Sequence, residues 1–406
     1  MIQTRTGNRQ LMRELNTNLI LNLVRKSNGV SQVDITNKTR LSSGTVTHII
    51  RELKNRNWVK ETGQRESPAG RKPTLLEFNA DAGHIVSAAF FADETYLAIL
   101  DLAGNIKHQH HFPTGAEKGP RHVFKNFAEH VRRTITQTGL RSNSILGIGV
   151  GFEGIVDPDK GLLLLSSRFG WRNVLIKDFI EQELGIRTFV ESDGGTMVLG
   201  EYHYGIGKGS RDLVAIDVDA GIGATAVLEG KIRRGTNHMF GEIGHTLMVP
   251  DGPVCGCGKK GCLEAVASGT AILNRVRAAL HEKQKTSITD AVHSPSTPEA
   301  LRAVFDAAER GDALVRDVIH QAGTYLGLAV AGVVNLLDPE LVVLTGSVIW
   351  ESKGLMLNRI KEMASAHVID SRYRLTRIEQ GSLGIQASLI GAATLVYEDI
   401  FSISLG

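Results

Sequence analysis

The chain has 406 residues, which is too many for a single hydrophobic core and predicts two or three domains. Its hydrophobic share of 42% is ordinary, its longest apolar stretch at residues 325–334 is too short to cross a bilayer, and no signal peptide precedes it, so we expect a cytoplasmic protein without a membrane partner. The net charge of +3 combines +8 over residues 1–80 with −5 over the remainder. A basic module on a mildly acidic body is typical of a DNA-binding unit joined to a sensor, although a solvated basic face accounts for the same charges.

Three helices are predicted near the N-terminus. Leucines at mostly four-residue spacing over residues 9–26 predict one amphipathic helix. Ser31 can cap a short second helix that ends near residue 39, and Ser42 can cap a third over residues 43–57. This succession is typical of a helix-turn-helix unit, whose last helix enters the major groove of DNA.

The third helix is expected to have one apolar and one polar face. The apolar face would pack on the module's own core through Val46, Ile49, Ile50 and Leu53. Exposed positions on the other face are small, polar or cationic, as suits contact with base edges and phosphates. With the cap included, the candidate DNA-binding residues of this helix are Ser42, Ser43, Thr45, Thr47, His48 and Arg51.

A wing is predicted after these helices, because two strand-like segments on either side of Gly63 and Pro73 flank a polar loop. Arg71 and Lys72 in that loop resemble the basic arms that enter the minor groove of A·T-rich DNA, although a solvated hairpin tip is the alternative. We therefore predict that residues 1–80 form a winged helix-turn-helix domain of the α+β class that binds double-stranded operator DNA.

The remaining chain is predicted to form two α/β lobes. The first series has strands at 84–91, 96–102, 105–111, 145–150 and 186–191 and helices at 121–138 and 174–184. The second has strands at 213–218, 223–229, 231–234 and 341–345, several helices and a closing helix from about Gly384. This matching order fits an actin-like fold with a ligand cleft between the lobes. The expected lobes are residues 81–195 with 384–406, and residues 196–383, the second carrying the oligomerisation surface.

A metal site is predicted between His245 and Cys262, where eighteen positions hold one histidine and all three cysteines of the chain. Thiolate and imidazole suit Zn²⁺, and a closed set of four such ligands is typical of a structural site. Neighbouring glycines at 256, 258 and 261 allow the tight backbone that Cys255, Cys257 and Cys262 need to converge. Three buried thiols without a metal are the alternative, and a disulfide fits less well because an odd count leaves one thiol unpaired.

The same region carries a family resemblance. Gly241-Glu-Ile-Gly-His245, followed by Cys255-Gly-Cys-Gly-Lys-Lys-Gly-Cys-Leu-Glu264, resembles the signature of the ROK family, which comprises repressors, open reading frames and sugar kinases. Supporting segments are Gly154-Ile-Val-Asp157, Gly170-Trp-Arg-Asn-Val174, Gly221-Ile-Gly223, Arg234-Gly-Thr-Asn237 and Asn335-Leu-Leu-Asp-Pro-Glu340. With a winged helix ahead of it, the chain is similar to the repressor branch. The resemblance implies a body of the sugar-kinase-like, ribonuclease H-like class.

The resemblance also implies roles for single residues. His245, Cys255, Cys257 and Cys262 would bind the structural zinc. A sugar in the cleft would be bound by Ser192, Asp193, Glu242, His245 and Glu264, since carboxylates and an imidazole can hydrogen-bond several hydroxyls. For Glu242 and Glu264 the alternative is a surface carboxylate. The chain departs from the family pattern at two positions. Ser192 stands where the family usually has asparagine, and Ser167 lies where the sugar kinases often have an asparagine.

The nucleotide site departs most from the kinases, whose first strand ends in Asp-X-Gly-Gly-Thr. Residues 88–95 here read Ala-Ala-Phe-Phe-Ala-Asp-Glu-Thr, and Leu344-Thr-Gly-Ser347 stands where a glycine pair is common. We therefore expect no enzyme but a sugar-responsive repressor of carbohydrate genes, acting as a homodimer or homotetramer on a palindromic operator. The alternatives are a sugar kinase with a DNA-binding appendage and a regulator controlled by a protein effector.

Overall fold

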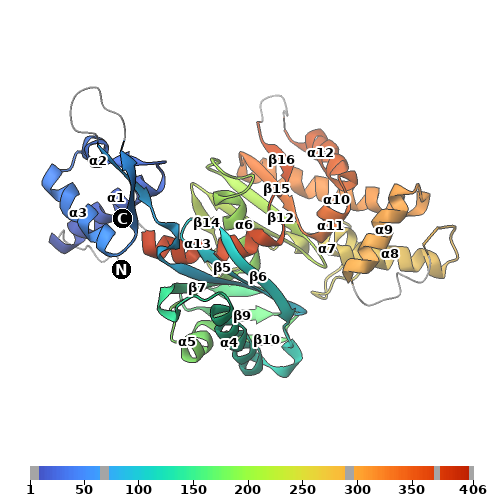
Figure 1. Ribbon diagram of the computed structural model, residues 1–406. Coiled ribbons are helices and arrows are strands. Elements are labelled where there is room, and N and C mark those ends of the chain that lie inside the picture. The colour runs from blue at the N-terminus through green and yellow to red at the C-terminus, as the bar shows by residue number, and fades with distance from the viewer. Residues whose placement is uncertain (1–8, 65–72, 289–296, 370–374, 402–406) are drawn as a thin grey trace.

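The computed structural model describes residues 9–64, 73–288, 297–369 and 375–401. Figure 1 shows a small N-terminal unit beside a larger body that contains two five-stranded sheets. Within the described residues, no helix is both long and apolar enough to cross a membrane.

The N-terminal unit has the helices and strands expected of a winged helix-turn-helix. Its elements are α1 Arg9–Arg25, β1 Val30–Ser31, α2 Gln32–Thr39, α3 Ser43–Asn55, β2 Val59–Gln64 and β3 Thr74–Phe78. The helix starts follow from local capping, because Ser31 and Asp34 form a capping box and Ser42 accepts the backbone N–H of Thr45. The strand order is β1-β3-β2. The predicted α3 ends two residues earlier than expected, and the wing tip with Arg71 and Lys72 lies outside the described residues.

The first five-stranded sheet has the order β11-β7-β4-β5-β6. Its strands are β4 His84–Phe90, β5 Glu94–Asp101, β6 Ile106–Pro113, β7 Ile145–Phe152 and β11 Thr188–Ser192. Helices α4 Pro120–Gln137 and α5 Ile176–Leu184 pack on one face through a core of aromatic and branched side chains. Short 3-10 turns lie at Ala80–Ala82, Ala116–Lys118 and Ser142–Ser144.

A small antiparallel sheet that we did not predict lies beside the first one. It has the order β10-β9-β8 and consists of β8 Ile155–Asp157, β9 Leu162–Ser166 and β10 Trp171–Leu175. Because Val174 and Leu175 pair with Leu163 and Leu162, the helix expected at 174–184 begins only at Ile176. The sequence contains no clear alternation here, and pairing between the strands decides the structure.

The second five-stranded sheet has the order β14-β13-β12-β15-β16. Its strands are β12 Leu213–Val218, β13 Ile222–Leu228, β14 Lys231–Arg233, β15 Leu341–Thr345 and β16 Arg377–Gln380. Helices packed around it are α7 Leu263–Ala267, α8 Gly269–His281, α9 Thr297–Glu309, α10 Ala313–Leu337, α11 Ser347–Glu351 and α12 Leu355–His367. Each sheet places two parallel partners on one side of its central strand β4 or β12 and an antiparallel hairpin on the other. The matching order of the two series is confirmed.

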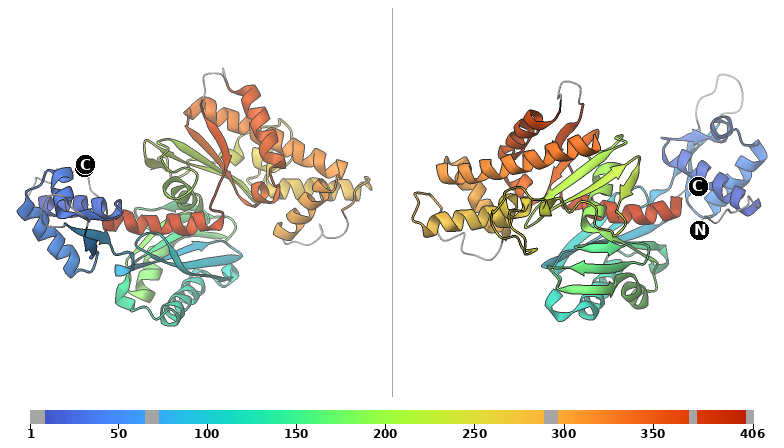
Figure 2. Two further views of the ribbon diagram at one scale, coloured as in Figure 1. Left: turned by 45° about the horizontal axis from the view of Figure 1, so that its top comes forward. Right: turned by 180° about the vertical axis from the view of Figure 1, so that it is seen from behind.

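Two helices lie between the sheets, α6 Asp193–His203 and α13 Ile385–Phe401. They can approach closely because glycines stand where they touch: a Cβ on Gly391 would clash with the backbone of Thr196, and one on Gly200 with the backbone of Ala387. Glycine also recurs on one face of β7, where a Cβ on Gly149 would clash with α13. Figure 2 shows α13 lying along the first sheet and ending at the N-terminal unit.

Candidate functional sites

The exposed face of α3 carries the predicted DNA-binding residues. Ser43, Thr47, His48 and Arg51 are exposed, and the aliphatic residues of the opposite face are buried as expected. Two of the candidates also hold the helix start, since the Ser42 and Thr45 hydroxyls lie 2.9 Å apart and Ser42 accepts the Thr45 N–H. The polar face of α3 is therefore accessible from outside the N-terminal unit.

The four predicted metal ligands converge. Ligand atoms of His245, Cys255, Cys257 and Cys262 all lie within 4.8 Å of one another. The Cys255 Sγ atom lies 3.6 Å from His245 Nδ1, and the Sγ atoms of Cys257 and Cys262 are 3.8 Å apart. One nitrogen and three sulfur atoms at these separations can surround a single metal ion.

The loop backbone explains why the ligands meet. Gly258 and Gly261 have positive φ angles of 84° and 71°, and a Cβ on Gly261 would clash with the carbonyl of Val249. Gly256 has no such constraint, so only two of the three predicted glycines are needed for this turn. Burial raises the pKa of Cys255 to about 12, which means that a bound cation is needed to keep that thiol ionised near neutral pH.

Two predicted sugar-binding carboxylates lie next to the metal ligands. The Glu242 Oε2 atom is 3.7 Å from His245 Nε2, the ring nitrogen that faces away from Cys255. Glu264 follows Cys262 in α7, and its Oε1 atom accepts the Cys255 thiol at 3.3 Å while Oε2 accepts the Ile222 N–H at 3.3 Å. Both carboxylates are therefore positioned by contacts with the metal ligands of residues 245–262, which we call the metal loop. Residues that contact metal ligands commonly have such fixed positions.

Asp193 stands at the first residue of α6, directly after β11. The backbone N–H groups of Gly194 and Gly154 favour the ionised form of its carboxyl group. Burial nevertheless raises the pKa of Asp193 to about 7, and the nearby charge of Glu153 adds to the shift. A carboxyl group whose pKa is raised to near neutral by burial and a neighbouring charge is typical of a functional site.

Strand β13 brings these groups together from separate parts of the chain. Gly194 of α6 approaches Thr225, Gly241 accepts the Ala224 N–H at 2.8 Å, and Glu264 accepts the Ile222 N–H. Three residues of one strand thus contact the segments that carry Asp193, Glu242 and Glu264. All five predicted sugar-binding residues lie on those segments, since Ser192 precedes Asp193 and His245 follows Glu242.

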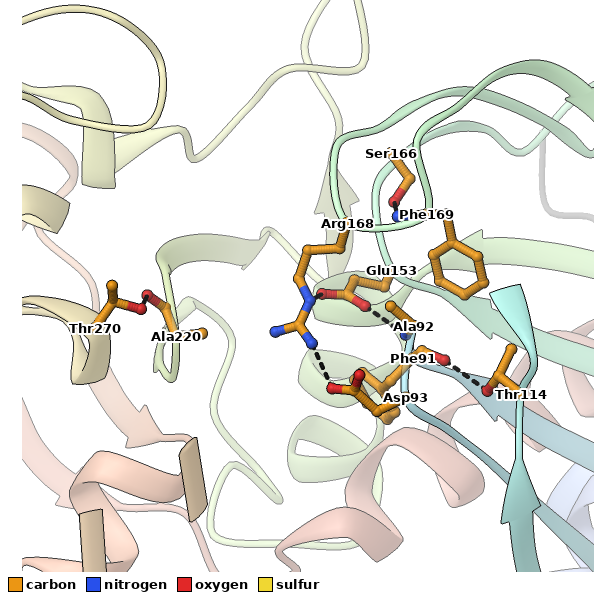
Figure 3. Close-up of polar contacts among 10 residues, drawn as sticks. All are labelled: Phe91, Ala92, Asp93, Thr114, Glu153, Ser166, Arg168, Phe169, Ala220 and Thr270. Carbon is orange, nitrogen blue, oxygen red and sulfur yellow. Dashed lines mark hydrogen bonds and ion pairs between the residues drawn. The ribbon is translucent and has the colours of Figure 1, made fainter. Parts of the chain in front are cut away.

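The structure adds polar residues that our sequence reasoning missed. Arg168 Nη2 lies 2.5 Å from Asp93 Oδ2, and Arg168 Nε lies 3.2 Å from Glu153 Oε1 (Figure 3). The Ala92 N–H donates to the other oxygen of Glu153 at 2.9 Å. These contacts tie the turn after β4 to the loop between β9 and β10, and the acidic sequence Ala92-Asp93-Glu94 was the only signal for them.

A second group of polar residues that we did not predict follows β12. There Thr270 donates its hydroxyl hydrogen to the Ala220 carbonyl at 2.8 Å, at the left of Figure 3. The neighbouring Asp219 carboxylate accepts both the N–H and the hydroxyl of Ser347. Burial raises the pKa of Asp217 well above its ordinary value, and Asp219, Asp193 and Glu153 raise it further. The space between the sheets therefore carries a concentration of carboxyl groups.

A third missed pair joins the two sheets. Arg234 follows β14, and its Nε and Nη2 atoms each lie 2.8 Å from Oε2 of Glu191 in β11. The segment Arg234-Gly-Thr-Asn237 was singled out in the sequence only as part of the family resemblance. Nothing local indicated its partner, which is 43 residues away.

Comparison with known proteins agrees with this architecture. The model of the ROK family matches residues 92–399, and that of a winged helix-turn-helix DNA-binding domain matches residues 8–60. The chain is 25% identical to the xylose repressor of Caldicellulosiruptor bescii over 398 residues, or 98% of both chains. It is 31% identical to the glucokinase of Halalkalibacterium halodurans over 319 residues, or 76% of this chain and 94% of the glucokinase.

Among solved structures, the crystal structure of a ROK family transcriptional regulator, described as a homologue of the E. coli MLC protein, matches with a TM-score of 0.82. The identity is 24%, and the match covers 96% of this chain and 97% of that one. The winged helix-turn-helix followed by an actin-like, kinase-fold body is therefore confirmed, as is the resemblance from which it was expected.

Proposed function

Because this chain belongs to the ROK family and begins with a winged helix-turn-helix DNA-binding domain, we propose that it is a sugar-responsive transcriptional repressor of carbohydrate genes. The observation that carries the proposal is the presence of both modules in one chain, in the order found along the full length of a xylose repressor. A DNA-binding module alone would bind an operator, and only the body can make that binding respond to a small molecule.

The effector site of the proposal is the region around β13. Ser192 and Asp193 reach it from the first sheet, and Glu242, His245 and Glu264 reach it from the metal loop. Carboxylates and an imidazole that converge from several elements suit a ligand with many hydroxyl groups. The positions of these residues support a sugar as effector, and D-xylose and D-glucose are the first candidates because they appear in the names of relatives.

The metal of the proposal is a structural Zn²⁺ bound by His245, Cys255, Cys257 and Cys262. The donor set of one imidazole and three thiols fits this ion, and all four atoms come from the protein. Bound zinc would hold the thiolates and so fix the loop that presents Glu242 and Glu264.

Phosphoryl transfer is not part of the proposal. Where the sugar kinases have Asp-X-Gly-Gly-Thr, this chain has a buried Phe90 and an Asp93 carboxylate paired with Arg168. The Asp219 carboxylate would repel a triphosphate, and the turn lacks glycines that let backbone N–H groups approach phosphate. The similarity to a glucokinase favours the kinase alternative, which predicts ATP consumption.

The proposed mechanism uses the layer between the sheets. A sugar that bridges Asp193 and Glu242 would favour one arrangement of the two sheets, and α13 would carry that change to the winged helix-turn-helix. In a symmetric dimer or tetramer this would alter the spacing of two recognition helices, which must match two half-sites. The effector releases DNA only if it binds the DNA-incompetent arrangement more tightly.

The experiment is fluorescence anisotropy of zinc-loaded protein on labelled DNA from its own upstream region, at fixed salt, against a panel of pentoses and hexoses. We expect tight binding that one sugar releases. Tight binding that no sugar affects would move control to a protein effector, and binding no tighter than to random DNA would contradict the repressor. A coupled assay with ATP and the same sugars tests the kinase alternative, for which we expect no turnover.

A further inference from the structure

One ion pair connects the two segments that carry the proposed effector-binding residues. Arg234 approaches Oε2 of Glu191 with two nitrogens, each at 2.8 Å. The Glu191 side chain is only 3% exposed. A buried carboxylate requires a partner, because an unpaired charge in that position is strongly destabilising. The pair is therefore a fixed link between β11 of the first sheet and the chain that leaves β14 of the second.

Glu191 also holds the residues that follow it. Its other oxygen, Oε1, accepts the N–H of Ser192 at 2.9 Å and lies 3.3 Å from the Ser192 hydroxyl. That hydroxyl oxygen in turn accepts the N–H of Gly195 at 3.1 Å and so caps α6. A Cβ on Gly195 would clash with the Glu191 side chain, so the glycine leaves room for this arrangement. Glu191 thus fixes the position of Ser192 and of the first turn of α6, which begins with Asp193.

Arg234 stands at the start of the segment that leads to Glu242 and His245. Its carbonyl accepts the Phe240 N–H at 3.1 Å, and Gly241 next to Phe240 accepts the N–H of Ala224 in β13. The backbone therefore joins Arg234 to the turn that presents Glu242. The same segment makes a second, longer contact with β8 of the small sheet, because His238 Nε2 lies 3.9 Å from Asp157 Oδ1.

We propose that Arg234 and Glu191 are positioning residues of the effector site. Their ion pair holds Ser192 and Asp193 at a fixed position relative to Glu242 and His245, so that a sugar meets a site that is already assembled. Neither side chain has to touch the sugar. This inference rests on the proposed function for its biological meaning, but the link itself exists whether or not a sugar binds.

The test uses full-length, zinc-loaded protein and hydrogen exchange without any sugar. The variants are Arg234→Gln, Glu191→Gln, the double variant and Arg234→Lys. Lysine keeps the positive charge but lacks the two guanidinium nitrogens that approach Glu191. The matched control is Arg233→Gln, because Arg233 is the adjacent residue and pairs with the exposed Glu229 at 3.6 Å. We expect amide exchange in residues 192–196 and 235–245 to rise about tenfold in Arg234→Gln and Glu191→Gln, with less change in Arg234→Lys.

Binding measurements then separate positioning from general stability. D-Xylose, D-glucose and N-acetyl-D-glucosamine are titrated into each variant by calorimetry, and zinc content and melting temperature are recorded. We expect affinity for the sugar that the wild type binds to fall on the order of tenfold to a hundredfold in Arg234→Gln, with zinc content retained and Arg233→Gln unchanged. The double variant should be no worse than either single one, because both remove the same link.

The outcomes distinguish this inference from the function on which it rests. Unchanged exchange in the two segments of Arg234→Gln would overturn the inference, as would full sugar affinity in that variant. Exchange that rises evenly over the whole body would also overturn it, because the pair would then act on overall stability. If exchange rises as expected but the wild type binds no sugar, the link stands and the sugar effector fails.

Discussion

Asp193 is a proposed effector-binding residue whose surroundings raise its pKa. It is the first residue of α6, beside Glu153, and burial raises its pKa to about 7. In the folded protein the carboxyl group keeps its proton between about pH 4 and 7, while in the unfolded chain it ionises near 4. The contribution of this group to stability therefore falls as pH rises through that window.

Sugar binding should respond in the opposite sense. The ionised carboxylate is the stronger hydrogen-bond acceptor, so we expect sugar affinity to rise roughly tenfold between pH 6 and 8 as Asp193 ionises. In Asp193→Asn this dependence should disappear, with weaker binding at pH 8. Calorimetric titration at both pH values measures it, and equal wild-type affinity at pH 6 and 8 would show that Asp193 does not accept from the sugar.

The stability of the protein should depend on the four metal ligands. Chelation, or Cys255→Ser, should lower the melting temperature by at least about 5 °C, because binding energy at a structural site is folding energy. Lys260→Ala, in the same loop but not a ligand, is the control. Metal content by elemental analysis and melting by calorimetry give the answer, and a chelated protein that melts at the wild-type temperature would contradict the site.

At the scale of elements, the contact between α6 and α13 depends on glycine. Gly391 and Gly200 allow the two backbones to touch at Thr196 and Ala387. Because α13 packs on the first sheet and α6 packs on the second, this contact sets the distance between the sheets.

Gly391→Ala should therefore destabilise the protein by about 1–3 kcal/mol, since the added methyl group meets backbone that cannot turn aside. Gly332→Ala is a matched control in α10, where a Cβ meets nothing within 4 Å, and it should stabilise by about 0.5–1 kcal/mol. Urea unfolding of both variants measures the difference. Equal effects of the two substitutions would mean that the helix contact adapts.

At the scale of the whole molecule, α13 reaches the DNA-binding unit through its last residue. Phe401 packs edge-on against Trp58 and Phe78 at centroid distances of 5.8 and 5.9 Å. The Arg25 guanidinium lies 4.8 Å from the centre of the same ring, and Asn22 donates to the Phe401 carbonyl at 3.0 Å. One helix therefore contacts the first sheet, α6 and the winged helix-turn-helix.

We expect Phe401→Ala to separate DNA binding from sugar response, because it removes the ring through which α13 contacts Trp58, Phe78 and Arg25 of the N-terminal unit. Replacing a buried phenylalanine with alanine lowers the free energy of unfolding by about 3 kcal/mol, and Phe401→Leu should lower it less. Anisotropy with and without sugar would show operator binding that sugar no longer releases. Normal release in Phe401→Ala would exclude this contact as the route of control.

Local signals in the sequence determined much of this protein. Ser31 and Ser42 act within three residues of their own position, so the helix starts of the DNA-binding unit could be predicted. The metal ligands lie within eighteen positions, and their chemistry alone indicates a metal. The family motifs indicated the two lobes for the same reason, because each motif is a short continuous segment.

Only the tertiary structure decided which distant residues meet. The three short strands between Ile155 and Leu175 have no period of their own and exist because they pair with one another. The same holds for Arg234 with Glu191 and for Arg168 with Asp93, whose partners are 43 and 75 residues away. Charged side chains are ordinarily solvated, and the Arg168–Asp93 pair stays largely exposed. Burial of Glu191 where the two sheets meet is what makes its pair with Arg234 a fixed link. That burial depends on the packing of α6 and α13, which no local pattern describes.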